Sequence, residues 1–232
     1  MTRVLVPVAV LDGQTVSPGL MNLLGTVDVT VLGYHVLPEQ TPPDQARLQY
    51  EERATAALTD LTEEFRTAGG AADHRLVFTH DRQQTIDRIA DEVGARALAI
   101  SRVTGDVDRI LVPLSGDVGV DRILSFVTEL VGDRDIGVTL FLATKSEDAD
   151  TDRLDAAAAT LRRNGIRVRT KAVTGRAPFG ALIDEASGID VIVMGERAPS
   201  VRSLVFGEES ERVASESVGP VLVVRDDRPT EE

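Results

Sequence analysis

The chain has 232 residues, 42% of them hydrophobic, and a formal net charge of −13. This length and apolar content argue against global disorder and favour one large domain or two small ones. The absence of cysteine excludes disulfides, thiolate nucleophiles and thiolate metal ligands.

The acidic charge is accompanied by a shortage of lysine, since Lys145 and Lys171 are the only two. Hydrated carboxylates suit a cytoplasm full of salt, where screening weakens their mutual repulsion. We interpret the chain as a protein of an extreme halophile; an ordinary acidic cytosolic protein is the alternative. Because nucleic-acid affinity comes mostly from lysine and arginine on phosphates, no nucleic-acid partner is expected.

The chain opens with "MTRVLVPVAV", which enters a strand directly and does not suggest a signal peptide. No apolar run approaches the ~18 residues of a membrane span, so we expect a cytoplasmic protein with no membrane insertion. Short apolar strands then alternate with helical patterns. Strands are expected at 4–10, 29–36, 76–78, 97–100, 110–114, 138–143, 168–173, 191–194 and 221–224.

Several of these strands are apolar at consecutive positions, which indicates burial on both faces in a parallel sheet. Helical stripes of apolar residues occupy 54–65, 120–131 and 154–163. Gly69-Gly70 is expected to end the first helix and Asn164-Gly165 the third. Strand and helix alternation predicts right-handed βαβ units and doubly wound α/β sheets.

The two halves of the chain repeat one pattern in the same order, which indicates an internal duplication. The paired segments are 3–8 with 109–114, 27–38 with 136–147, and 89–101 with 183–195. We expect a shortened domain over 1–104, a nearly complete domain over 105–226, and a disordered tail over 227–232. The first is shortened because Ser101 to Asp108 leaves no room for a closing helix and a fifth strand.

The second half resembles the universal stress protein family through "RILVPLSG", "VTLFLA", "IDVIVMG" and the closing "GEESERVASESVGPVLVVR". The resemblance implies two adenine-nucleotide-hydrolase-like, Rossmann-like sheets in tandem and a role in stress response or regulation. Nucleotide-binding members carry Gly-x2-Gly-x9-Gly-Ser/Thr after the fourth strand, where glycine N–H groups, a helix start and a hydroxyl hold phosphate. In this chain Gly195 matches the first glycine of the motif, but Ala198 stands in place of the second. The spacer that follows is one residue short and ends at Gly207, and Glu208 stands in place of the hydroxyl residue.

The family's aspartate at the end of the first strand is also missing, with Ser115 in the second half and Ala9 in the first. Glu208 at about 4 Å from a phosphate would be repelled by roughly 4 kcal/mol at an effective dielectric near 20. At the first turn of a helix the same carboxylate is favourable by about 0.3–1 kcal/mol. We therefore expect a vestigial nucleotide site, in which Arg197 and Arg202 pair with Glu208 and its neighbour or attract an anion.

The function expected is non-catalytic regulation without a tightly bound cofactor. The alternatives left open are an ATP- or AMP-binding switch with slow or no hydrolysis, a regulatory module for a membrane transporter, and an adenylate-chemistry enzyme on the same fold. The histidines His35, His74 and His80 are expected to be exposed or hydrogen-bonded and not metal ligands.

The last strand suggests how the chain assembles. In the family this strand pairs with its counterpart from a second unit, and the first half has lost its own. Because an unpaired apolar edge promotes aggregation, we expect a homodimer through Val221, Leu222, Val223 and Val224. Closure of this edge by a segment of the first half is the alternative.

Overall fold

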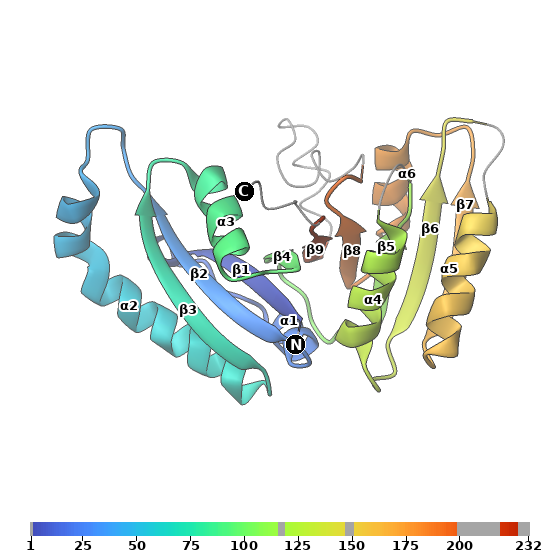
Figure 1. Cartoon of the computed structure of the whole chain (residues 1–232), viewed down its shortest axis with the longest axis horizontal. Coiled ribbons are helices and arrows are strands. Elements are labelled where there is room, and N and C mark those ends of the chain that lie inside the picture. Colours follow the sequence, from blue (N-terminus) through green and yellow to red (C-terminus); the bar gives the residue numbers. More distant parts are fainter. Residues whose placement is uncertain (1, 116–118, 147–150, 199–218, 227–232) are drawn as a thin grey trace.

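The computed structural model describes residues 2–115, 119–146, 151–198 and 219–226. Nine strands form one sheet in the order β3-β2-β1-β4-β9-β8-β5-β6-β7, which runs through the whole molecule (Figure 1). The strands are β1 (Arg3–Ala9), β2 (Asp28–Val36), β3 (Ala71–Thr79), β4 (Ala97–Ile100), β5 (Arg109–Pro113), β6 (Gly137–Ala143), β7 (Arg167–Val173), β8 (Val191–Gly195) and β9 (Val221–Val224).

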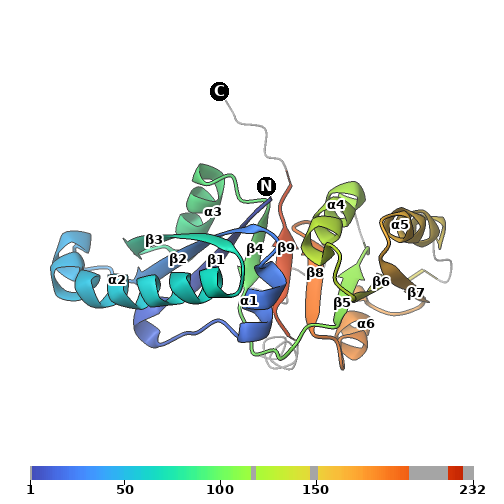
Figure 2. The same cartoon turned by 90° about the horizontal axis from the view of Figure 1, so that it is seen from below.

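Helices cover both faces of this sheet (Figure 2). They are the 3-10 helix η1 (Val10–Asp12) and the α-helices α1 (Pro18–Leu24), α2 (Pro43–Thr67), α3 (Arg82–Glu92), α4 (Val120–Val131), α5 (Thr151–Arg163) and α6 (Pro178–Glu185). In the first half α2 packs on β2, where Leu58 fills the space above Gly33. On the opposite face Leu5 and Leu32 pack against Ile86 of α3.

The sequence placed every one of these strands, and the α/β fold class is confirmed. The three predicted helical stripes lie in α2, α4 and α5. Among the strands, the largest boundary difference is at β3, which begins at Ala71 instead of residue 76. Its first residues alternate between exposed and half-buried because β3 lies at the edge of the sheet, so they lack the apolar run used to recognise a strand.

The two halves have the same local strand order, with β1 between β2 and β4 and β5 between β6 and β8. Val4 is in register with Val29 and Ala97. Ile110 is in register with Val138 and Val191. These two triplets occupy equivalent positions in the three repeated segment pairs of the sequence. The register therefore provides a residue-by-residue correspondence between the halves.

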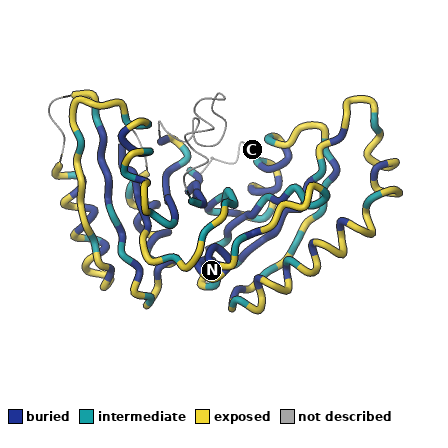
Figure 3. The backbone as a smooth tube through the Cα atoms, turned by 180° about the vertical axis from the view of Figure 1, so that it is seen from behind, coloured by how far each residue is buried: buried dark blue, intermediate teal, exposed yellow. Residues whose placement is uncertain are grey.

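All neighbouring strands are parallel except β4 and β9, which pair antiparallel where the two halves meet. The two predicted sheets are thus joined edge to edge into one. At this junction all four residues of β9 are buried, and β4 alternates between buried and half-buried residues (Figure 3). Exposed residues lie mainly along the outer helices and loops. Among the described residues, no helix has the length and apolar character needed to cross a bilayer.

Candidate functional site

The predicted site lies at the carboxyl ends of β5 and β8, two adjacent parallel strands. Ile110 and Leu111 of β5 are in register with Val191 and Ile192 of β8. Ser115 follows the end of β5, and Gly195 is the last residue of β8. The topology therefore brings these two residues to the same edge of the sheet, which is where open α/β sheets bind ligands.

Ser115 is buried, with 4% of its surface exposed, and its hydroxyl oxygen already has a structural partner. The backbone N–H of Ala143, at the end of β6, donates to Ser115 Oγ at 2.8 Å. This bond ties the loop after β5 to the neighbouring strand. Serine thus serves as a structural acceptor where the resemblance implies a carboxylate facing the ligand.

The turn after β8 is closed by its own backbone. Ala198 N–H donates to Gly195 O at 2.9 Å, and the Ala198 side chain is buried in the main core. Glu196 N–H donates to Val224 O of β9 at 2.8 Å. These two donors are engaged within the chain, so they are not directed toward a phosphate position.

Arg197 forms an ion pair with Asp226, with Nε 2.6 Å from Oδ2. Asp226 in turn donates its N–H to Glu196 Oε2 at 3.2 Å. The guanidinium of Arg197 is thus held at the end of β9 by a carboxylate that the sequence analysis did not consider. Gly207 and Glu208, which complete the predicted motif, lie outside the described residues, as does Arg202.

The four residues of β9 do not form the free edge that the dimer prediction required. Leu98 of β4 is in register with Val223 on one side, and Met194 of β8 on the other. Both edges of β9 are therefore hydrogen-bonded within the chain. The dimer interface expected at Val221, Leu222, Val223 and Val224 is wrong for this reason, and the alternative of closure by the first half is correct.

Arg225, directly after β9, is a buried cation that the sequence analysis missed. Its Nη2 donates to Asp91 Oδ1 of α3 at 2.6 Å, and Arg225 N–H donates to Arg96 O at 2.9 Å. The guanidinium thus fixes the end of β9 to the first half. Asp91 and Arg225 are 134 positions apart, so no local pattern could have indicated the pair.

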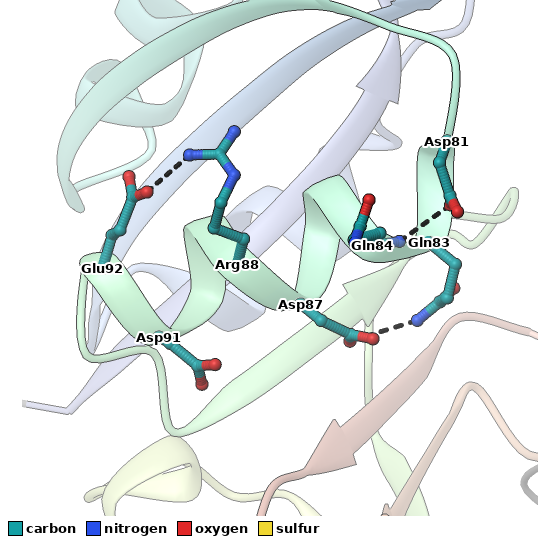
Figure 4. Close-up of a pocket in the computed structure, with 7 residues that line it drawn as sticks. All are labelled: Asp81, Gln83, Gln84, Asp87, Arg88, Asp91 and Glu92. Carbon is teal, nitrogen blue, oxygen red and sulfur yellow. Dashed lines mark hydrogen bonds and ion pairs between the residues drawn. The ribbon is translucent and has the colours of Figure 1, made fainter. Parts of the chain in front are cut away.

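A groove runs along the exposed face of α3 (Figure 4), and it is acidic. It is lined by Asp81, Gln83, Gln84, Asp87, Arg88, Asp91 and Glu92. Most of these side chains already have partners: Asp81 accepts from Gln84 N–H at the start of the helix, and Gln83 donates to Asp87. In the described part of the chain no group of three or more acidic, histidine or cysteine residues could hold a metal ion.

The three histidines have separate environments. His74 Nδ1 lies 3.1 Å from Thr62 Oγ1, and His80 Nδ1 lies 3.3 Å from Leu37 O. The His35 ring packs beside those of Tyr50 and Phe78. Hydrogen bonding and ring packing thus account for all three.

Part of the chain is similar to a known protein family. Residues 141–225 match the model of the universal stress protein family. The match begins in β6 and ends just after β9, so it covers the turn after β8 that carries Gly195 and Ala198. A comparison with curated proteins gave no match.

Solved structures of universal stress proteins share the fold of the whole chain. A universal stress protein from Archaeoglobus fulgidus superimposes with a TM-score of 0.68 at 20% identity, over 99% of this chain and 97% of the other. A Pseudomonas aeruginosa protein with the same family description gives a TM-score of 0.54 at 13% identity, over 97% and 93%. These likenesses show that both halves of the chain take part in the shared architecture.

Proposed function

We propose that the chain is a non-catalytic stress-response or regulatory protein of the universal stress family that does not bind ATP tightly. The match of residues 141–225 to the family model supports the family assignment. The equivalent registers of the two halves support a tandem arrangement, with a shortened unit over 1–104 and a nearly complete one over 105–226. A cytoplasmic location accords with this role.

The proposal depends mainly on the burial and the hydrogen bond of Ser115. Its hydroxyl is buried and accepts from Ala143, so a structural serine occupies the position where the resemblance implies the family's carboxylate. The donors of the neighbouring turn are also engaged, with Ala198 N–H on Gly195 and Arg197 on Asp226. A nucleotide that used these groups would have to break these contacts first, and that cost would lower its affinity.

Calorimetry with ATP in molar KCl tests the proposal. We expect no binding, or a dissociation constant above about 10 μM, which corresponds to roughly 7 kcal/mol. A thermal-shift screen with AMP and cyclic dinucleotides extends the test to other nucleotides. Tight ATP binding would instead favour a nucleotide-binding switch, and turnover would favour an enzyme.

A repaired motif provides the positive control. Ala198→Gly combined with Glu208→Ser and one inserted spacer residue restores the family pattern after β8, and this variant should bind ATP more tightly than the natural chain. If the repaired chain gains nothing while folding normally, the motif is not what limits binding in this scaffold.

The homodimer expected from the sequence stays a prediction, but only for a surface other than β9. Light scattering with size exclusion in 2 M KCl distinguishes a monomer of 24.9 kDa from a particle of twice that mass.

A further inference from the structure

A basic groove lies at the amino ends of β5, β6 and β7, opposite the end that carries Ser115. Three arginines line it, Arg109 from β5 and Arg167 and Arg169 from β7. Its floor is β6, where Gly137 has no side chain and Thr139 is half-buried. The cavity has a volume of about 460 Å³. Three arginines lining one groove stand out in a chain of net charge −13.

The arginines of β7 point to the face of the sheet that carries α6. Lys171 binds Glu185 of α6, and alternate residues of a strand share a face, so Arg167 and Arg169 project to that side as well. Helices α5 and α6 lie on opposite sides of this end of the sheet (Figure 2). No residue of α6 lines the groove, so the amino ends of β6 and β7 extend beyond the cover of this short helix.

The first half shows what the same surface looks like when it is closed. Thr30 is in register with Leu5 and Asp73, just as Thr139 is with Leu111 and Arg169. Arg3, the counterpart of Arg109, binds Asp73 with Nη1 3.5 Å from Oδ2. Thr30 below them is fully buried.

The second half reverses the charge of this surface. Arg169 stands where the first half has Asp73, and Arg167 where it has Ala71. Gly137 replaces Asp28, which removes a carboxylate from the floor. Asp73, which pairs with Arg3 in the first half, is therefore replaced by a cation, Arg169, in the second half. Two arginines of like charge repel each other and leave the groove open for an anion.

The carboxylates around the groove neutralise part of this charge. Asp135 binds Arg167, with Oδ1 2.7 Å from Nε. Asp190 accepts the N–H groups of Asp108 and Arg109 at 3.0 and 2.8 Å and lies 3.8 Å from Arg109 Nε. Asp108 is a third carboxylate at the rim.

Arg169 differs from its two neighbours, because within the described residues it has no carboxylate partner. The guanidinium of Arg109 lies against Gly188, at the turn before β8, with its Nη1 3.4 Å from where a Cβ would stand. Arg109 on β5 and Arg169 on β7 line the groove from the two strands beside β6. Thr139 of β6 lies next to Arg169, and its hydroxyl has no hydrogen bond within the described part of the chain.

We propose that this groove binds a small oxyanion with two negative charges, the phosphate group of a small molecule, between Arg109 and Arg169. Guanidinium groups offer paired N–H donors that match phosphate oxygens, and the Thr139 hydroxyl donates a further bond. The missing side chain at Gly137 lets the anion approach the strand. A polyanion such as a nucleic acid is disfavoured because the net charge of −13 repels it.

The test exchanges one residue for its counterpart. Arg169→Asp places a carboxylate where the first half has Asp73, so that Arg109 can form the pair that Arg3 forms there. This pair should close the groove. Binding of inorganic phosphate and pyrophosphate is measured by phosphorus NMR and calorimetry, at the lowest KCl concentration at which circular dichroism shows folded protein. We expect saturable binding to the natural chain that Arg169→Asp weakens at least about tenfold, the equivalent of one charge-assisted hydrogen bond.

Arg75→Asp is the matched control, because it makes the same charge change at an exposed position of the other edge strand, β3. It should leave phosphate binding unchanged. Absence of saturable binding to the natural chain, or equal weakening by Arg75→Asp and Arg169→Asp at equal melting temperature, would overturn the proposal. Thr139→Val should weaken binding less than Arg169→Asp, and no effect of either change would place the anion elsewhere.

Vesicles with an anionic phospholipid distinguish a lipid headgroup from a free phosphate compound. We expect no flotation of the protein with these vesicles, because its net charge repels an anionic membrane. Flotation that is lost in Arg169→Asp would refute the assignment to a small molecule.

Discussion

Single polar residues hold the two halves together at the residue scale. Arg134 donates to carbonyl oxygens at the C-terminal ends of two helices, to Asn22 at 2.8 Å and Leu23 at 2.9 Å in α1, and to Leu130 and Val131 in α4. The C-terminal end of a helix carries partial negative charge, so one guanidinium stabilises both. Burial lowers the pKa of Arg134, but an arginine stays charged.

Glu129 makes a second link between the halves, from α4 to the start of β1. Thr2 Oγ1 donates to Glu129 Oε2, and Arg96 Nη1 donates to Oε1 at 2.8 Å. Burial raises the pKa of Glu129, but the hydrogen bonds from Thr2 and Arg96 and the charge of Arg96 together lower it below the ordinary 4.5. A carboxylate with a lowered pKa in the folded state stabilises the fold above the unfolded pKa.

Glu129→Gln should therefore destabilise the protein at pH 7, and the difference from the natural chain should shrink as the pH falls below 4.5. In this range the natural carboxylate is protonated on passing through its folded pKa, and it loses its advantage. Denaturant unfolding between pH 3 and pH 7 measures the difference. Glu92→Gln is the control: it removes an exposed pair with Arg88 and should change stability by less than about 1 kcal/mol at any pH. A pH-independent loss in Glu129→Gln would contradict the electrostatic explanation.

The decisive feature at the scale of elements is β9. Its four apolar residues correctly predicted burial on both faces, but not which strand lies beside it. A strand hydrogen-bonded on one side to β8 and on the other to β4 lies in the interior of the sheet. It therefore joins the two halves of one chain, whereas the sequence analysis expected it to join two copies of the chain.

Val223→Pro should for this reason unfold or strongly destabilise the chain instead of dissociating a dimer. Proline removes a backbone donor and does not fit an interior strand, so we expect a loss of at least about 2 kcal/mol. Thermal unfolding followed by circular dichroism gives the change in stability. Val103→Pro, in the exposed connection between β4 and β5, should be mild. A folded Val223→Pro chain with a natural melting temperature would show that β9 is not an interior strand in solution.

Surface charge acts at the scale of the whole molecule. A net charge of −13 produces self-repulsion in the compact state, and two lysines among 25 basic residues leave arginine as the main counter-charge. Local pairs such as Arg176–Asp184 and Arg3–Asp73 offset part of this repulsion, but they lie at the surface and contribute little individually.

The melting temperature should therefore rise steadily as KCl increases from 0.1 M to 2 M, because salt screens the repulsion between carboxylates. Differential scanning calorimetry measures the trend, and a non-ionic solute at matched osmolarity separates screening from solute exclusion. A flat profile would argue against a protein adapted to high salt.

Periodicity by itself determined much about this protein. Apolar runs such as Val191–Met194 and Val221–Val224 predicted buried strands, the stripe at 120–131 predicted α4, and the ordered repeat predicted equivalent halves. These features are local, since each depends on the spacing of apolar residues along one element. The departures at Ser115 and Ala198 were also visible from the sequence, because a motif is defined by residue type and spacing.

Tertiary structure alone decided which groups meet. The pairing of β4 with β9, the Arg197–Asp226 and Arg225–Asp91 ion pairs, and the acceptor role of Ser115 all join residues far apart in sequence. The basic groove is of the same kind: Arg109 and Arg169 come to line one groove only when β5, β6 and β7 lie side by side. Spacing along the chain fixes which side of an element is buried, but the partner across it depends on how the sheet is assembled, and that is a property of the whole fold.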